Sequence, residues 1–181
     1  MTVLFEKFFE DLLKVEGGFV DDARDSGGAT RYGVTEAVAR ANGYSGAMKD
    51  FPLSLAKSIY KAQYWDALRL DDIQNLCPGL CLKLADIGVN MGTKQAAFFL
   101  QRLLNVLNNR GQLYPDIDAD GRIGPGTIAA LKKFLSIRNQ DGETVLVRAL
   151  NCMQGMFYIS LAERREKDEA FLFGWLRNRV H

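Results

Sequence analysis

Imidazole is almost missing from this sequence, because its one histidine, His181, is the last of 181 residues. A serine–histidine or cysteine–histidine nucleophile pair needs a positioned imidazole, and catalytic zinc sites commonly use one as a ligand. The end of a chain is a poor place for either, since terminal residues are rarely held in one position. Acid–base chemistry in this protein therefore falls to carboxylates.

Cysteine is also scarce: Cys77, Cys81 and Cys152 are an odd number with no spacing typical of a disulfide framework or a metal site. A free cysteine behaves as a small apolar residue, so we interpret these as buried thiols. We expect no metal and no cofactor.

An excess of one charge and a long apolar run are both lacking. The 23 basic and 22 acidic residues nearly cancel, which argues against nucleic acid as a partner. Charged residues such as Glu6, Lys7 and Glu10 interrupt the first apolar segment, unlike the core of a signal peptide, and no other run approaches a membrane span. We expect synthesis in the cytoplasm and no stable membrane insertion.

What the sequence does contain is helical periodicity, in a chain with 48% apolar residues. Apolar residues recur at three- and four-residue steps over 3–16, and Gly17 with Gly18 stops this predicted helix. Glycines and aspartates over 19–35 indicate turns, with a short hairpin through ATRYGVT. The fold class is therefore mainly α, with at most a small hairpin. Further helices are predicted after Thr35 and at 51–65, 78–91, 93–107, 127–138, 143–165 and 168–179.

The segment VEGGFVDDARDSGGATRYGVT, residues 15–35, has the residue types of a carboxylate active site. A carboxylate in the last turn of a helix is disfavoured in its ionised form, so the pKa of Glu16 tends upward, as a general acid requires. Asp25, in a polar loop, stays ionised, and Thr30 can hold a water. Glycosidic bond cleavage fits such a set. A solvated helix end followed by ordinary turns is the alternative interpretation.

Five other residues are candidate substrate contacts. Tyr32 lies in the same loop, while Tyr64 and Trp65 end a predicted helix, where core packing is the competing account. Asp86 and Asn90 share one helical face and can point a polar pair into a cleft. A capping or buried hydrogen-bonding role is the alternative for that pair.

The run Asp116, Asp118, Asp120 mimics the start of a calcium loop, but Thr127 stands where such a loop places its bidentate glutamate. We interpret this segment as a structural turn.

Four segments resemble known families, in the order in which those families carry them. The string EGGFVDDARDSGGATRYGVT resembles the E-G-G-Y…D-x-G-G-x-T-x-x-G-[IV]-T signature of glycoside hydrolase family 108, the phage and prophage endolysins with N-acetylmuramidase activity. YKAQYWDAL is similar to that family's Y-x-x-x-Y-W segment and LADIGVNMG to its D-x-x-x-N-x-G segment. DADGRIGPGTIAAL and FGWLRNRV look like the small peptidoglycan-binding-type helical region that usually follows.

The resemblance implies a lysozyme-like fold with a catalytic lobe at 1–92 and a peptidoglycan-binding-like lobe at 93–181 packed on it as one unit. It implies cleavage of the β-1,4 bond between N-acetylmuramic acid and N-acetylglucosamine, with Glu16 as the catalytic acid. The spacing of Glu16, Asp25 and Thr30 is also similar to that of phage-type lysozymes. Phe19 stands where the signature has tyrosine, which keeps an aromatic ring but loses a hydroxyl.

Bacterial peptidoglycan is the expected partner, and a cytoplasmic enzyme reaches the wall only after the membrane is opened, so we expect holin-assisted export. A non-catalytic peptidoglycan-binding or secretion-activating protein is the alternative, since some relatives are described as secretion activators. A wall enzyme that cleaves peptides or amides is disfavoured by the single histidine.

Overall fold

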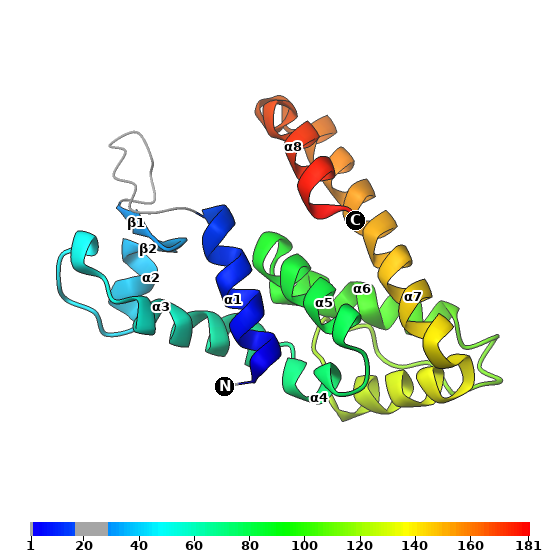
Figure 1. Ribbon diagram of the computed structural model, residues 1–181. Helices are drawn as coiled ribbons and strands as arrows, with labels where there is room; N and C mark the ends of the chain where they lie inside the picture. Colours follow the sequence, from blue (N-terminus) through cyan, green and yellow to red (C-terminus); the bar gives the residue numbers. More distant parts are fainter. Residues whose placement is uncertain (1, 17–28) are drawn as a thin grey trace. The chain divides into compact units, whose positions relative to one another are not determined.

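The computed structural model describes residues 2–16 and 29–181 and is mainly helical (Figure 1). Two compact units, Met1–Asp66 and Ala67–His181, divide the chain. The first contains α1 (Val3–Glu16), β1 (Thr30–Arg31), β2 (Val34–Thr35), α2 (Glu36–Ala41), η1 (Met48–Asp50), α3 (Leu53–Tyr60) and η2 (Lys61–Asp66). The second contains α4 (Leu70–Gln74), α5 (Pro78–Met91), α6 (Thr93–Val106), α7 (Pro125–Arg164), η3 (Glu166–Asp168) and α8 (Glu169–Arg179). The predicted mainly α fold is confirmed, and so is the small hairpin, formed by β1 and β2.

Helix α1 begins and ends where the periodicity predicts. Its apolar stripe is buried and consists of Phe5, Phe8, Phe9 and Leu12. The charged residues pair on the exposed surface of the helix, where Asp11 accepts hydrogen bonds from Lys7 at 3.2 Å and from Lys14 at 2.8 Å. The helix is thus amphipathic, and burial of its stripe is what holds it in the fold.

Four aromatic rings fix α1 against α3 and η2. Phe5 meets Trp65 edge to face, with ring centroids 5.2 Å apart and planes at 75°, and Phe9 meets Tyr60 at 5.8 Å. Trp65 exposes none of its surface. We call Phe5, Phe9, Tyr60 and Trp65 the aromatic anchor. Rings in these geometries attract one another beyond the burial of apolar area, so the anchor sets the direction of α1.

The winding changes where the sequence predicts one continuous α-helix over 51–65. Helix α3 ends at Tyr60, and η2 continues it as a π-helical turn over Lys61–Asp66. Residues five apart do not share a face of an α-helix, but the i→i+5 bonding of a π-turn brings them close to one line. Burial of both Tyr60 and Trp65 against α1 therefore favours the π-turn.

In the second unit, α5 packs against α4, α6 and α7. Its side chains at Leu80, Leu84 and Ile87 are fully buried, as is Leu100 of α6. The boundary between the two compact units lies after Asp66, and α5 belongs to the second unit because it packs on α6 and α7. The predicted division into a catalytic lobe at 1–92 and a peptidoglycan-binding-like lobe at 93–181 stays a prediction.

Helix α7 joins two predicted helices. Its backbone breaks at Asn139, with φ 50° and ψ −140°, between the predicted helices at 127–138 and 143–165 (Figure 1). Asparagine adopts a positive φ more readily than most residues. By length and composition alone α7 is also long and apolar enough to cross a membrane, with 33% of its most apolar window buried. In this unit it supplies core residues, among them Leu131 and Leu150.

The thiols give a test of this packing. Burial, with a smaller effect of the Glu143 charge, raises the pKa of Cys77 to about 12, and burial raises the pKa of Cys81 to about 12. Cys152 is exposed. Because the thiolate is the reactive form, we expect a disulfide reagent at pH 8 to modify Cys152 alone in the native protein and all three thiols after denaturation. Fast modification of Cys77 or Cys81 in a native Cys152→Ser variant would contradict the burial of these thiols.

Candidate active site

The carboxyl end of α1 carries Glu16, the last residue of the helix. Unpaired carbonyl groups give this end a partial negative charge. Asp11 of the same helix favours its ionised form, because hydrogen bonds from Lys14 and Lys7 hold its pKa below the ordinary value. Asp11 is therefore ionised at neutral pH and is no proton donor. Glu16 as the catalytic acid stays a prediction from the sequence. Asp25 lies outside the described residues, and its role stays a prediction.

The hairpin holds two further candidates in a defined register. Thr30 pairs with Thr35, and Arg31 pairs with Val34. The two residues of the turn both have positive φ, 54° at Tyr32 and 73° at Gly33. Positive φ at both central residues is typical of the tight turns that match the twist of a hairpin. Tyrosine is an unusual residue for the first of them, since its bulk makes this conformation costly.

The ring of Tyr32 is held by its neighbour. The Arg31 guanidinium lies over the ring, 5.0 Å from its centroid, and donates a hydrogen bond of 3.2 Å to the Tyr32 hydroxyl. Both side chains are half-buried. The backbone of Tyr32 is in a costly conformation, and a cation holds its ring. Backbone strain of this kind is common at functional sites.

The hairpin leads directly into the next helix. Thr35 is the N-cap of α2, where its hydroxyl accepts a hydrogen bond of 3.4 Å from the Val38 amide. The Glu36 amide donates to the Ala29 carbonyl at 3.0 Å, which closes the base of the hairpin. The position of Thr30 is therefore set by backbone hydrogen bonds on both sides of the turn.

Tyr64 and Trp65 differ in their surroundings. Trp65 is buried in the aromatic anchor, as the core-packing account expects, and a contact of Trp65 with substrate stays a prediction. Tyr64 is half-buried and stacks on Tyr60, with centroids 5.4 Å apart. Substrate binding by Tyr64 stays a prediction.

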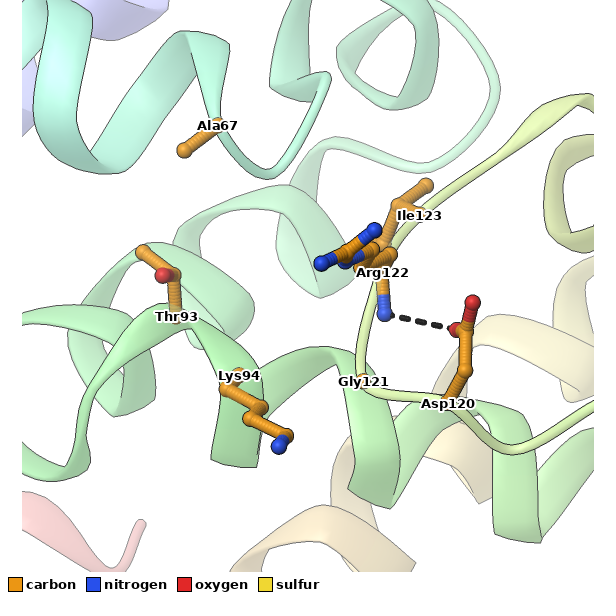
Figure 2. A pocket seen from close by; sticks show the side chains of 7 residues that line it. All are labelled: Ala67, Thr93, Lys94, Asp120, Gly121, Arg122 and Ile123. Atoms are coloured by element: carbon orange, nitrogen blue, oxygen red, sulfur yellow. Dashed lines mark hydrogen bonds between the residues drawn. The ribbon is translucent and has the colours of Figure 1, made fainter.

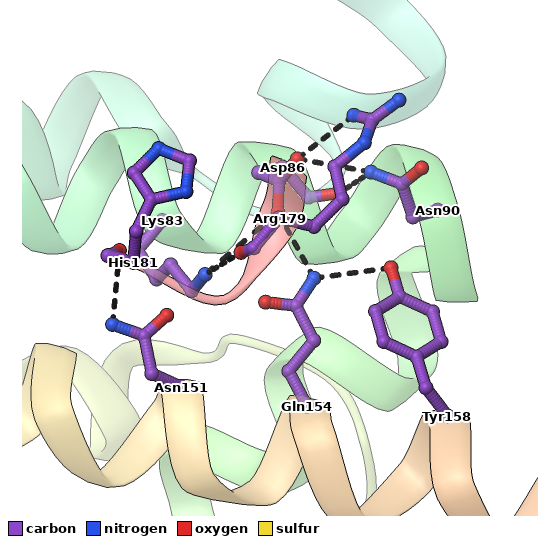
Figure 3. Close-up of polar contacts among 8 residues, drawn as sticks. All are labelled: Lys83, Asp86, Asn90, Asn151, Gln154, Tyr158, Arg179 and His181. Carbon is purple, nitrogen blue, oxygen red and sulfur yellow. Dashed lines mark hydrogen bonds and ion pairs between the residues drawn. The ribbon is translucent and has the colours of Figure 1, made fainter. Parts of the chain in front are cut away.

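Asp86 and Asn90 share one face of α5, as predicted, and they bond to each other. The Asn90 amide donates to the Asp86 carbonyl at 2.7 Å and to its Oδ1 at 3.0 Å (Figure 3). Asp86 also accepts from the Arg179 guanidinium at 3.0 Å and from the Gln154 amide at 3.0 Å. The two residues are half-buried, and the bonds of Asp86 link α5 to α7 and to the end of α8, as the hydrogen-bonding alternative expects. A contact of Asp86 or Asn90 with substrate stays a prediction.

Sequence reasoning missed the hydrogen bonds that hold the C-terminal residues near Asp86. Lys83, which is buried, donates to the Arg179 carbonyl at 2.6 Å, and burial lowers its pKa. Asn151 donates to the His181 carbonyl at 3.0 Å. Figure 3 shows these groups converging on the end of the chain. Spacing along the chain gives no signal for such pairs, because each joins residues that are far apart in the sequence.

The loop that mimics a calcium site is hydrogen-bonded to its own unit. Asp116 accepts from the Asn108 amide at 2.6 Å, and Asp120 accepts from the Gln101 amide at 2.9 Å. Over 2–16 and 29–181, no three His, Cys, Asp or Glu side chains are grouped so that they could hold a metal ion. The interpretation as a structural turn agrees with these contacts.

Comparison with known proteins assigns both halves of the chain. Residues 9–92 match the family model described as Glycosyl hydrolase 108, and residues 95–180 match the one described as Predicted Peptidoglycan domain. A solved structure titled "Structure of Brucella abortus SagA" is similar over 98% of this chain and 98% of that chain, with 24% identity and a TM-score of 0.58, which shows a shared fold. No curated protein matches the chain. The resemblance found in the sequence is thereby confirmed.

The turn offers a test of Tyr32. Tyr32→Asn creates an Asn-Gly pair, the residue pair that such a turn prefers, so we expect the free energy of unfolding to stay the same or rise by about 0.5–1 kcal/mol. Loss of the ring should nevertheless lower hydrolysis of peptidoglycan. Denaturant unfolding and turbidity clearing measure the two effects. A variant that is as stable and as active as the wild type would remove Tyr32 from the site.

Proposed function

We propose that this chain, a peptidoglycan hydrolase of glycosyl hydrolase family 108 with a predicted peptidoglycan domain, is an N-acetylmuramidase with Glu16 as its general acid. The bond cleaved is the β-1,4 bond between N-acetylmuramic acid and N-acetylglucosamine. The observation that carries the proposal is the position of Glu16, which ends a helix whose direction the aromatic anchor fixes.

Glycoside hydrolysis needs a proton on the leaving oxygen at the moment when the bond breaks. A carboxyl group can supply it near neutral pH only if its pKa is raised. The partial negative charge at the carboxyl end of α1 acts in that direction on Glu16, because it disfavours a second negative charge beside it. This is the physical reason for assigning the proton donor to Glu16.

The sugar ring develops positive charge as the leaving group departs, and a second, ionised carboxylate stabilises that charge or helps to activate water. Asp25 has this role in the proposal. Thr30 places a hydroxyl on the hairpin, where it helps to orient the water. Tyr32 and Tyr64 contact the glycan. Asp86 joins α5 to α7 and to the end of α8 through its hydrogen bonds, and Asn90 donates a hydrogen bond to Asp86.

Glu16→Gln tests the assignment of the acid. An amide cannot donate a proton as a carboxylic acid does, so hydrolysis of purified peptidoglycan should fall by at least about 100-fold. Glu10→Gln is the matched control, since it removes the same charge from an exposed position of the same helix, and it should clear peptidoglycan at the wild-type rate. Equal clearing by Glu16→Gln and wild type would take the role from Glu16.

The products identify the bond. A muramidase leaves new reducing ends on muramic acid and no new amino termini, which mass spectrometry and amine labelling of the released fragments distinguish. Reducing ends on glucosamine, or new amino groups, would contradict the proposed bond even if Glu16 proved essential.

Delivery to the wall belongs to the same proposal. Phe5, Phe8 and Phe9 of α1 are core residues, so this helix is part of the fold. We expect the chain, acting as an endolysin of phage or prophage type, to reach peptidoglycan after a holin-type partner opens the membrane.

A cell assay checks the delivery. In intact bacteria that produce the protein without any pore, activity should stay inside the cells, and chloroform should then cause rapid lysis. Wall fragments or active protein in the medium of intact, pore-free cells would contradict holin-assisted export.

A further inference from the structure

A polar cavity of about 650 Å³ lies in the second unit, between the start of α6 and the loop that precedes α7. Thr93 and Lys94 line it from α6, and Asp120, Gly121 and Arg122 line it from the loop (Figure 2). Its volume falls in the range of small-molecule sites in proteins, so a ligand of a few residues or sugar units fits inside.

Two cations line this cavity, and the charge of one of them, Arg122, also acts on Asp120. Lys94 and Arg122 are exposed, and within residues 2–16 and 29–181 neither side chain makes a hydrogen bond or an ion pair. Asp120 is the one carboxylate of the lining, so the cations outnumber it. The first turn of α6 adds positive potential, because its N-cap, Gly92, has no side chain to satisfy the free amide groups. The cavity therefore attracts anions.

One buried side chain holds the loop residues that line the cavity through hydrogen bonds. Gln101, which is 1% exposed, donates from Nε2 to Asp120 Oδ1 and to the Arg122 carbonyl, both at 2.9 Å. Its Oε1 accepts from the Gly121 amide at 2.8 Å. These bonds fix the backbone that carries Arg122, so its guanidinium enters the cavity from a rigid wall.

Gly121 allows the loop to approach α6 this closely. Its φ is +77°, and a Cβ atom at this position would lie 2.6 Å from Lys94 Cγ and 2.9 Å from the Lys94 carbonyl oxygen. Only glycine fits both the conformation and the space. The two cations thus reach one cavity from two walls that are held together by packing.

Asp120 stays an acceptor throughout the neutral range. The Gln101 hydrogen bond, followed by that of the Arg122 backbone amide, holds the pKa of Asp120 below its ordinary value. Both of these bonds end on Oδ1. The Arg122 charge acts on Asp120 more weakly than these two hydrogen bonds, and neither Lys94 nor Arg122 forms a salt bridge with the carboxylate, so both cations can bind a ligand.

We infer that this cavity binds the peptide side chains of peptidoglycan, with a peptide carboxylate held by Lys94 and Arg122. The amino sugars of peptidoglycan are uncharged while the peptide is attached, and the free carboxylates belong to the peptide. Guanidinium and ammonium groups bind carboxylates through charge-assisted hydrogen bonds. The inference rests on peptidoglycan as the polymer that the chain hydrolyses, but not on the proposed bond or on Glu16.

A binding titration tests the inference on the full chain. The probe is a synthetic stem peptide, L-Ala-D-Glu-diamino acid-D-Ala, titrated into Glu16→Gln protein and into the same protein with Arg122→Gln or Lys94→Gln. We expect each substitution to weaken binding by about tenfold, the equivalent of one charge-assisted hydrogen bond, and added salt to weaken binding as well. Lys132→Gln is the matched control, an exposed lysine of the same unit outside the cavity, and it should bind as before.

A second substrate distinguishes the peptide carboxylates from the lactyl carboxylate of muramic acid. Glycan strands freed of peptide by an amidase carry only the lactyl carboxylate. We expect the Arg122→Gln and wild-type proteins to hydrolyse these strands equally while differing on intact peptidoglycan. Absence of peptide binding, equal binding by all variants, or Arg122-dependent binding to the peptide-free strands would each overturn the inference. Failure of the muramidase proposal alone would leave the peptide titration unchanged.

Discussion

The packing of Phe5 against Trp65 is the contact on which the candidate active site depends. A helix of the length of α1 is marginal in water by itself, so its stability comes from burial of its apolar stripe. The aromatic anchor provides that burial, and it also fixes where the helix points. Glu16 is the last residue of α1, so the contacts of Phe5 and Phe9 earlier in the helix determine where the proposed acid lies. An ion pair between Glu6 and Lys57 also joins α1 to α3.

Local signals in the sequence predicted local structure well. Gly17 and Gly18 marked the end of α1, the RYGVT segment marked the hairpin, and the gap in periodicity near Asn139 marked the break in α7. In each case the residues that determine the backbone lie within a few positions of it. The same reasoning placed Glu16, Thr30 and Tyr32 on elements of one compact unit.

Features set by distant residues could not be predicted in this way. The π-turn η2 exists because Trp65 and Tyr60 both pack on α1, and the hydrogen bonds of Asp86 come from Arg179 and Gln154. The segment that resembles family 108 at LADIGVNMG thus supports the framework of the second unit. The cavity with Lys94 and Arg122 likewise joins two segments that only folding brings together. A chain that cuts glycan with one unit and holds peptide with the other would hydrolyse intact peptidoglycan faster than peptide-free glycan strands.

The central claim is that the carboxyl end of α1 presents an acid to the glycosidic oxygen of peptidoglycan. A crystal structure of the Glu16→Gln protein with a muramic acid–glucosamine oligosaccharide tests it most directly. The account predicts the side-chain amide of residue 16 at about 3 Å from the oxygen that joins muramic acid to glucosamine. A bound oligosaccharide whose scissile oxygen lies beyond the reach of residue 16, with that side chain directed into solvent, would contradict it.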